Sequence, residues 1–397
     1  MKNSPSPKPP SQKSLPRKLL LVGAGHAHIG LLRQLIDAKN RLNSLNNLQI
    51  TLVTEQPQTI YSGMLPGWMA GHYSLADISI DAKSLCKRAG VRFIQQKLAK
   101  VEADSSSLST TKNNTFDYDL LSLNTGADTD IRWLNNDQEQ ADISKKVIPI
   151  RPIYPFVERW QQIIADAKGS DQYHLAIVGA GAAAVELVLA AQYRLQQING
   201  INNNNNNYQA YLVCGDHLLP SFNERFRQKV IGQLERHNVK IIYSKAKGYS
   251  EGQLYTNTDA LSMNAVIAAT GVTGSAWTDY TDLQTVDDGF IAVNETQQSV
   301  SHSNVFAVGD VATRVDQDMA HSGVHAVFGG AVEADNLLAY LADKPLKRYK
   351  PKNRTLYLLS CGDKYAIGSW GKYSTQGRWV WTLKRHIDKR FVKSANR

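Results

Sequence analysis

The chain has 397 residues, of which 42% are hydrophobic and 20% charged, so it is long enough for two or three domains with apolar cores. No apolar run approaches the roughly 20 residues that a membrane-spanning helix needs, and the N-terminus lacks the apolar centre of a signal peptide. We therefore expect a cytoplasmic protein. Its cysteines, Cys86, Cys214 and Cys361, form no C-x-x-C or metal-ligand spacing, which argues against a disulfide framework and a zinc or iron-sulfur site.

The net charge of +10 is concentrated at the two ends of the chain. Residues 1–18 carry +5 and residues 344–397 carry +13, which leaves −8 for the residues between them. Basic ends bind nucleic acid or anionic lipid in some proteins and are simply solvated in others. We expect residues 1–17 to be a disordered tail, because their Pro- and Ser-rich composition cannot build a core. No nucleic-acid partner is expected.

The strongest local signal is the segment KLLLVGAGHAHIGLLRQL, residues 18–35, in which an apolar run ends at two glycines and passes into a helical pattern. This pattern is typical of a strand, a tight turn and a helix whose first N–H groups hold a phosphate. Gly23 permits the turn, and Gly25 lets the backbone approach a pyrophosphate. The third glycine of G-x-G-x-x-G is replaced by His28, a poor residue for close packing of the helix on the strand.

The same pattern recurs in LAIVGAGAAAVEL, residues 175–187. Gly179 and Gly181 take the places of the first two glycines, and Ala184, an accepted variant, takes the third. One dinucleotide fold needs one such turn. The pair of turns therefore predicts two bound dinucleotides.

Two apolar strands, residues 118–123 and 265–269, are also matched, because each leads into a Thr-Gly pair. These pairs are Thr125-Gly126 and Thr270-Gly271. The whole second glycine motif lies between them, so we predict an α/β protein in which one Rossmann-like domain is inserted into another. The predicted boundaries are 18–150 and 286–345 for the first domain, 151–285 for the inserted domain, and 346–397 for a small C-terminal segment.

Acidic residues at strand ends are candidates for binding sugar hydroxyls. Glu55 follows the strand predicted at 49–53, although an exposed surface glutamate would look the same. Asp216 lies just past the end of the strand at 209–213. Gly309-Asp310 ends a third apolar strand, and the helix predicted at 321–341 would aim its positive end, at Ser322 and Gly323, toward the ligand of Asp310.

Four further segments are assigned from their composition. Residues 60–68 are apolar and glycine-rich where a loop should be polar, which indicates burial against core or against something flat and makes Met64 and Leu65 candidate contacts. Residues 76–90 are predicted to form a helix. A hairpin with a polar tip at 104–114 is expected, and the asparagines at 202–207 are assigned to a loop.

Taken in their order along the chain, these motifs resemble those of the flavoprotein superfamily that binds two dinucleotides. Within that superfamily they resemble the type II NADH dehydrogenases. A closer resemblance is to the NADH dehydrogenase-like flavoprotein module fused ahead of selenide, water dikinase domains. It rests on GAGHAH, YSGMLPGWMAGHYS, LLSLNTGAD, LYLLSCGDKYAIGSWG and GRWVWTLKRHIDKRF, and it covers roughly residues 18–392. A histidine at position 28 is normal for that module.

The resemblance implies FAD on the first fold, with Gly23 and Gly25 at the pyrophosphate and Asp310 on the ribitol. It implies NAD(P)H on the second fold and matches Glu186 to a family glutamate near the nicotinamide and flavin, although a buried structural glutamate would fit the pattern too. The disulfide-reductase branch carries redox cysteines in the loop that here reads YSGMLPGW. Without them, the implied activity is electron transfer from NAD(P)H through FAD to a small acceptor, with a quinone as the expected acceptor.

Two alternatives stay open on sequence grounds. A sulfide:quinone oxidoreductase would need cysteines near the flavin, where only Cys361 is a remote candidate. A non-catalytic flavoprotein could bind NAD(P)H to sense redox state. NADH is expected to be used and NADPH tolerated, and a homodimer is left open.

The last predicted helix, within residues 378–397, is amphipathic. Its apolar arc is predicted to contain Trp379, Val380, Leu383, Ile387 and Phe391. The rest of the helix surface is predicted to be polar and carries Lys384, Arg385, Asp388, Lys389 and Lys393. Such a helix is typical of an element lying on an anionic membrane surface, although the arc could instead pack on the protein. We expect a peripheral position on the cytoplasmic face.

Overall fold

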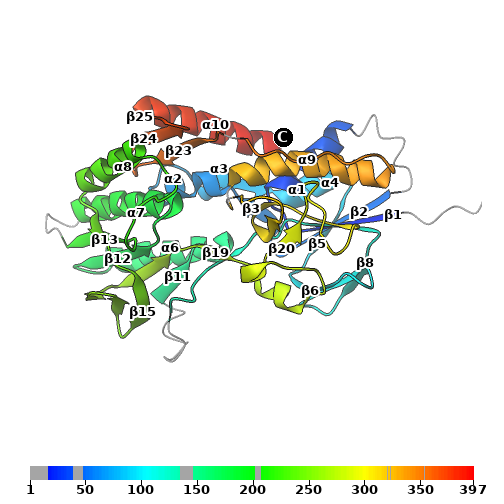
Figure 1. Ribbon diagram of the computed structural model, residues 1–397. Helices are drawn as coiled ribbons and strands as arrows, with labels where there is room; N and C mark the ends of the chain where they lie inside the picture. Colours follow the sequence, from blue (N-terminus) through cyan, green and yellow to red (C-terminus); the bar gives the residue numbers. More distant parts are fainter. Residues whose placement is uncertain are drawn as a thin grey trace, which may run out of the picture.

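Two parallel β-sheets organise the molecule, and the C-terminal elements lie across both of them (Figure 1). The computed structural model describes residues 17–38, 48–134, 146–201, 207–319, 321, 323–352 and 354–397. The predicted tail up to residue 16, the asparagines at 202–206 and Ser322 lie outside the described residues.

The first sheet has the strand order β21-β9-β1-β2-β5, and all its neighbouring strands are parallel. Its strands are β1 (Arg17–Val22), β2 (Leu48–Thr54), β5 (Arg92–Gln95), β9 (Leu120–Leu123) and β21 (Val305–Ala307). Successive side chains of β1 enter different cores: Leu19 and Leu21 pack on the face of α1 (His26–Ala38) and α9 (Gly323–Leu341), Leu20 and Val22 on the other. Burial on both faces explains why these strands are continuous apolar runs.

The second sheet repeats this arrangement with the order β11-β18-β12-β13-β14, again all parallel. Its strands are β11 (Val147–Pro149), β12 (Tyr173–Val178), β13 (Tyr208–Val213), β14 (Lys240–Ile242) and β18 (Ala265–Ala268), with helices α6 (Ile153–Lys168), α7 (Ala182–Ile201) and α8 (Glu224–Arg236). The whole second sheet lies in sequence between β9 and β21 of the first. The predicted α/β class and the insertion of one fold into the other are confirmed, and β11 precedes the boundary expected at residue 150.

In each fold, a three-stranded antiparallel meander comes just before one strand of the parallel sheet, β9 in the first fold and β18 in the second. The meanders are β6 (Leu98–Glu102), β7 (Ser107–Thr110) and β8 (Thr115–Asp117), and β15 (Ala246–Ser250), β16 (Gln253–Thr256) and β17 (Ala260–Ser262). The prediction of one polar tip over 104–114 is wrong, because β7 lies within it and Leu108 packs into the core.

Short elements connect these units. They are β3 (Gln58–Ile60), η2 (Ser62–Met64), α2 (Leu65–Met69), α3 (Leu75–Ile78), β4 (Ser79–Asp81), α4 (Ala82–Ala89), β10 (Asp128–Thr129), β19 (Val272–Thr273), η3 (Ala276–Tyr280), η4 (Asp287–Gly289), β20 (Ile291–Val293), η5 (Gly309–Val311) and β22 (Ala312–Arg314). The single helix predicted at 76–90 is wrong. β4 pairs with β3 and interrupts it, and the Asp81 carboxylate accepts from Ser84 N to begin α4.

The C-terminal unit consists of a three-stranded antiparallel sheet and a long helix. Its elements are β23 (Leu356–Ser360), β24 (Ala366–Trp370), β25 (Tyr373–Gly377) and α10 (Arg378–Asn396). The sheet contacts α7 and α8 of the second fold, whereas α10 contacts α1, α3 and β4 of the first. This unit therefore joins the two folds from one side (Figure 1).

The helix α10 packs with a different face from the one predicted. Val380 is fully buried, but Trp379, Leu383 and Ile387 are 59%, 40% and 43% exposed. Lys384 and Asp388, predicted on the polar side, are buried. They can be buried because they bond to each other and to neighbouring protein groups, as described below.

Candidate active site

The first glycine turn joins β1 to α1 and is built tightly against Asn124. Gly23 has φ of +87°, and a Cβ on it would lie 2.4 Å from the Asn124 carbonyl oxygen. A Cβ on Gly25 would lie 2.2 Å from Asn124 Oδ1. Asn124 also accepts from Ala27 N and donates to the Val308 carbonyl oxygen at 2.6 Å. Packing inside the protein therefore already requires both glycines.

The second turn, between β12 and α7, has the same construction. Gly179 has φ of +153°, and a Cβ there would lie 2.2 Å from the Ala269 carbonyl oxygen and 3.0 Å from Ala184 Cβ. Gly181 is exposed and has open space where a Cβ would be. A ligand can therefore approach the backbone at Gly181, and Ala184 serves the close packing expected of the third position.

His28, at the third position of the first motif, is completely buried rather than facing a ligand. Its Nδ1 lies 2.6 Å from the Gly23 carbonyl oxygen and its Nε2 lies 2.6 Å from Ser122 Oγ. Close helix contact is made instead at Gly330 of α9, where a Cβ would lie 2.5 Å from Ala27 Cα. Burial lowers the pKa of His28 to about 4, so the ring is neutral at pH 7.

Buried polar atoms without a partner in the described protein gather at the carboxyl ends of the first sheet. They are Asp310 Oδ1, Thr125 Oγ1 and His26 Nε2. The other Asp310 oxygen, Oδ2, is bonded to Arg151, which follows β11 of the second sheet. Unpaired buried polar atoms are costly. A ligand hydroxyl could donate to Asp310 Oδ1, and a ligand hydroxyl or phosphate oxygen could accept from Thr125 Oγ1. The residues present therefore fit a dinucleotide cofactor at the first turn.

Glu186, on the first turns of α7, meets a buried polar network from the C-terminal unit. Its Oε1 accepts from Ser360 N at 2.7 Å. Lys384 Nζ of α10 donates to Asp388 Oδ2 at 2.9 Å and to the Gly63 carbonyl oxygen at 2.7 Å. Burial raises the pKa of Glu186, although the Lys384 ammonium opposes this shift. Burial also disfavours charge on Lys384, but Glu186 and Asp388 outweigh it and raise the pKa of Lys384.

Aromatic rings extend this network to the first glycine turn. Tyr61 donates to Asp388 Oδ1 at 3.1 Å, and its ring centroid lies 4.7 Å from that of Phe391. His26, the first residue of α1, lies 5.4 Å from Tyr61 and 5.6 Å from Phe391, measured between ring centroids. α10 therefore reaches the first glycine turn through Phe391, and the charge of its Lys384 acts on Glu186, which follows the second turn.

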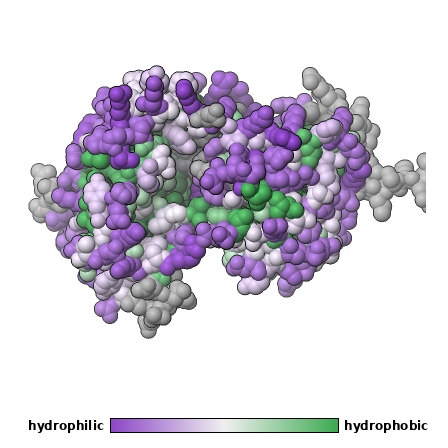
Figure 2. Space-filling model, viewed as in Figure 1, coloured by the Kyte–Doolittle hydropathy of each residue, from purple (hydrophilic) through white to green (hydrophobic). Residues whose placement is uncertain are grey.

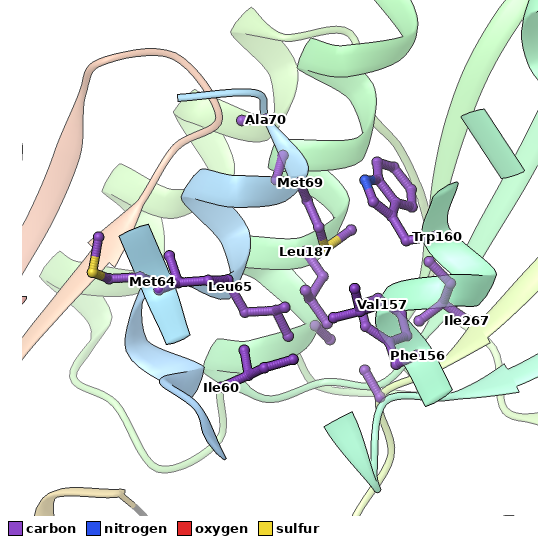
Figure 3. Packing of buried hydrophobic residues seen from close by; sticks show 14 of the residues in the cluster. Ile60, Met64, Leu65, Met69, Ala70, Phe156, Val157, Trp160, Leu187 and Ile267 are labelled. Carbon is purple, nitrogen blue, oxygen red and sulfur yellow. The ribbon is translucent and has the colours of Figure 1, made fainter. Parts of the chain in front are cut away.

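The segment between β3 and α3 supplies contact between the folds. Met64 and Leu65 are almost fully buried, and Figure 3 shows Leu65 and Met69 packed toward residues of α6 and α7 such as Phe156 and Leu187. Of the two expected positions for this segment, against core or against something flat, its side chains take the one against core. Between the two folds the surface is hollowed, with apolar residues on part of its wall (Figure 2).

The remaining candidates lie at the expected strand ends but differ in their surroundings. Glu55 is exposed and lies 3.9 Å from Lys97, and Asp216 is exposed and lies 3.9 Å from Lys245. Thr270 donates to the Asp130 carbonyl oxygen. The glycines fall into two groups: Gly126, Gly271 and Gly323 have open space where a Cβ would be, whereas at Gly309 a Cβ would lie 2.9 Å from Asn124 Nδ2.

Sequence reasoning missed Asn124, Arg151, His26 and Lys384. Asn124 had a local signal, since it precedes Thr-Gly where the matched second copy has Ala269. The other three act through partners that are distant in sequence.

Each cysteine is buried and free. Burial raises the pKa of Cys86 to about 12 and that of Cys214 to about 11, and burial beside Asp363 and Glu186 raises the pKa of Cys361 further. These thiols are therefore protonated and poor nucleophiles at pH 7. Within the described ranges, no three His, Cys, Asp or Glu side chains are grouped to hold a metal ion.

Two glycine turns at the carboxyl ends of two matched parallel sheets define a protein with two dinucleotide-binding folds. The chain matches the family model described as pyridine nucleotide-disulphide oxidoreductase over residues 17–327, and it belongs to that family.

Individual relatives agree with this assignment. The chain is 21% identical to the type II NADH:quinone oxidoreductase of Staphylococcus aureus (strain MSSA476) over 394 residues, which cover 95% of each chain. Its fold is similar to that of NDH2 from Plasmodium falciparum, solved in complex with NADH (TM-score 0.78, 14% identity, covering 96% of this chain and 97% of that one). It is also similar to sulfide:quinone oxidoreductase from Aquifex aeolicus (TM-score 0.77, 15% identity, covering 96% and 91%). The resemblance to type II NADH dehydrogenases predicted from the sequence is confirmed, whereas the link to selenide, water dikinase modules stays a prediction.

Proposed function

We propose that this protein is an FAD-dependent NAD(P)H:quinone oxidoreductase. The observation that carries the proposal is the pair of glycine turns, one in each sheet, with the unpartnered Asp310 Oδ1 and Thr125 Oγ1 beside the first turn. The relatives named type II NADH:quinone oxidoreductase, and NDH2 solved with NADH, support the choice of donor and acceptor.

FAD belongs, in this proposal, to the first fold, formed by residues 18–150 and 286–345 apart from β11, with NAD(P)H on the inserted fold up to residue 285. Bound FAD supplies the chemistry that passes two electrons from nicotinamide to acceptor. The protein residues bind and orient the two ligands. The residues assigned to FAD are Gly23, Gly25, Glu55, Met64, Leu65, Thr125, Gly126, Gly309, Asp310, Ser322 and Gly323, with His28 acting through the turn; those assigned to NAD(P)H are Gly179, Gly181, Ala184, Asp216, Thr270 and Gly271.

Glu186 is the proposed catalytic residue. It lies past the second turn, and the raised pKa that burial imposes allows its carboxyl group to carry a proton closer to neutral pH. A quinone takes up two protons along with two electrons, and in this proposal the carboxyl group of Glu186 supplies one of these protons. Lys384 and Asp388 hold this region together from α10.

Anaerobic stopped-flow absorbance tests the function. Mixing with NADH should bleach the flavin, and a following mix with quinone should restore it. Bleaching that quinone cannot reverse would support a sensing flavoprotein instead, and reduction by sulfide but not by NADH would support a sulfide:quinone oxidoreductase. Glu186→Gln should keep the bleaching and slow the quinone-dependent step.

An anionic membrane surface is the proposed location of the enzyme. In the described part of the chain, no helix has both the length and the apolar character needed to cross a bilayer. Trp379, Leu383 and Ile387 form an exposed stripe along α10, and exposed Trp370 and Tyr373 lie on the adjacent strand pair. Exposed basic residues flank the stripe at Arg378, Arg385, Arg390 and Lys393. Aromatic and apolar groups beside basic ones suit an anionic lipid interface, where each cation adds about 1 kcal/mol.

Flotation with anionic liposomes tests this location. Full-length protein should float at low salt, and the triple variant Trp379→Ser, Leu383→Ser, Ile387→Ser should not. Removing residues 378–397 is a poorer test, because Lys384 and Phe391 contact the site. The matched control is Tyr280→Ser, which alters a 66% exposed aromatic residue far from α10 in sequence. Wild-type protein that stays with the soluble fraction would refute the membrane location.

A further inference from the structure

A buried chain of polar side chains connects α9 to the first glycine turn. Glu333 of α9, Ser122 of β9 and His28 of α1 are at most 1% exposed. Glu333 Oε1 lies 2.8 Å from Ser122 Oγ, Ser122 Oγ lies 2.6 Å from His28 Nε2, and His28 Nδ1 lies 2.6 Å from the Gly23 carbonyl oxygen. These contacts lie inside the protein, beside the turn rather than in the ligand space.

Hydrogen-bond chemistry limits how protons can be arranged along this chain. The Gly23 carbonyl oxygen can only accept, so His28 Nδ1 donates to it, and Nε2 of the neutral ring must then accept. The single hydroxyl proton of Ser122 can satisfy either His28 Nε2 or an ionised Glu333, but not both. A protonated Glu333 resolves this conflict, because it donates to Ser122 and leaves the serine proton for His28.

Burial favours this uncharged arrangement. Burial raises the pKa of Glu333 to about 8, although the hydrogen bond with Ser122 acts to lower it. Burial also lowers the pKa of His28 to about 4, although the hydrogen bond with Gly23 acts to raise it. Within the described residues, no other titratable or charged side chain contributes to either shift. All donors then point in one direction, from Glu333 to Gly23, and bonds in such chains strengthen one another.

The orientation of the Gly23 carbonyl matters because the peptide group is planar. In a trans peptide the C=O of Gly23 and the N–H of Ala24 point in opposite directions. Holding the carbonyl toward His28 therefore turns the Ala24 N–H toward the outside of the glycine turn. Outward N–H groups at such a turn are the donors that bind phosphate.

We propose that Glu333, together with Ser122 and His28, is a positioning residue for FAD: in its protonated form it completes a one-way hydrogen-bond chain that fixes the phosphate-binding turn. The inference rests on the proposed placement of FAD at this turn. Ionisation of Glu333 diverts the Ser122 proton from His28 and loosens the turn. FAD affinity therefore falls as Glu333 loses its proton.

The test is the dissociation constant of FAD, measured by flavin fluorescence on protein reconstituted with FAD on either side of pH 8. Wild-type protein should bind FAD roughly tenfold more weakly on the alkaline side, about the effect of one lost hydrogen bond. Glu333→Gln keeps a donor toward Ser122 and cannot ionise, so its affinity should not change with pH. Ser122→Ala should bind weakly at every pH. Asp335→Asn, on the same helix but at an exposed ion pair with Lys347, should keep the wild-type profile.

Infrared spectra add a readout that does not depend on binding. At neutral pH the difference spectrum of wild type minus Glu333→Gln should show the C=O stretch of a buried carboxylic acid, and taking the difference removes any band from Glu186, which both proteins keep. A wild-type profile in Glu333→Gln, a flat profile in the wild type, or absence of the band would overturn this inference alone. Failure of the wild type to bind FAD at any pH would overturn the proposed function as well.

Discussion

The ammonium group of Lys384, near the end of the chain, donates a 2.7 Å hydrogen bond to the carbonyl oxygen of Gly63 near its beginning. Through this bond and the bond from Tyr61 to Asp388, α10 holds the segment that packs between the two folds. The two faces of α10 differ in their surroundings. Its inner face holds the site together, and its outer face carries the stripe of Trp379, Leu383 and Ile387.

Removing the buried cation should destabilise the protein strongly. Lys384→Met leaves the Asp388 carboxylate without its cationic partner, and breaking a buried ion pair costs about 3–5 kcal/mol. The double variant Lys384→Met, Asp388→Leu should recover much of that free energy of unfolding in urea titrations. Lys100→Met, at a pair with Glu102 in which both side chains are more than 40% exposed, should cost under about 1 kcal/mol. The cycle needs Asp388→Leu alone as well. If the losses of unfolding free energy in the two single variants simply added up to the loss in the double variant, the coupling between Lys384 and Asp388 would be contradicted.

Asp310→Ala should reduce FAD content. It removes the acceptor that the ribitol would use and leaves Arg151 without its ion pair. We expect the FAD affinity to fall by at least about tenfold, since an unsatisfied buried group costs about 1–3 kcal/mol. The measurement is the ratio of flavin absorbance to protein, with Asp310→Asn, which keeps one acceptor oxygen, as the milder variant.

Gly179→Val should separate the two ligands. A side chain at this position clashes with the Ala269 carbonyl oxygen, which lies 2.2 Å from the place of the Cβ. The variant should remain yellow while KM for NADH rises or reduction is lost. Loss of FAD with normal NADH binding would reverse the assignment of the two folds.

The pH dependence of stability should carry the signature of Glu333. Its pKa is raised by burial from 4.5 to about 8, so between these values the folded protein binds the proton that the unfolded chain has lost. This group therefore makes the free energy of unfolding decrease as pH rises from 4.5 to about 8, with no further change above. His28, lowered from 6.5 to about 4, makes it increase with pH between those values.

Urea unfolding of Glu333→Gln against wild type across this range isolates the glutamate. The variant should gain stability relative to wild type toward alkaline pH, on the order of a few kcal/mol, because one pKa unit corresponds to about 1.4 kcal/mol. A difference between the two proteins that is constant with pH would show that Glu333 ionises normally.

The protein is predicted to distinguish only weakly between NADH and NADPH. Asp216 suits the free ribose hydroxyls of NADH, whereas Lys245, 3.9 Å away, suits a 2′-phosphate. We expect NADH to be preferred modestly, and Lys245→Ala to reduce kcat/KM for NADPH more than for NADH. A preference for NADPH of about tenfold or more, or an equal effect of Lys245→Ala on both, would contradict this.

Much of the fold could be predicted because its signals are local. A glycine that must adopt a positive φ between an apolar strand and a helix, as at Gly23, is visible within a few residues, and so is its second copy at Gly179. The paired Thr-Gly strand ends then established which fold is inserted into which. Asp310 is proposed from the same kind of local pattern, an acid after a strand-ending glycine, and its role in binding FAD stays a prediction.

Partners between distant residues could not be predicted, because burial of a polar group is decided by what the fold brings to it. The helical pattern of residues 378–397 placed Lys384 and Asp388 on a polar face, but Gly63 and Tyr61 satisfy their polar atoms inside the protein. From the sequence, His28 is a poor residue for close packing of the helix on the strand. In the fold its ring is hydrogen-bonded to Ser122, which in turn contacts Glu333. The two folds and their glycine turns could be predicted because short-range sterics and apolar patterning define them. Which polar side chains are buried and paired could be seen only in the folded chain, because it depends on atoms contributed from hundreds of residues away.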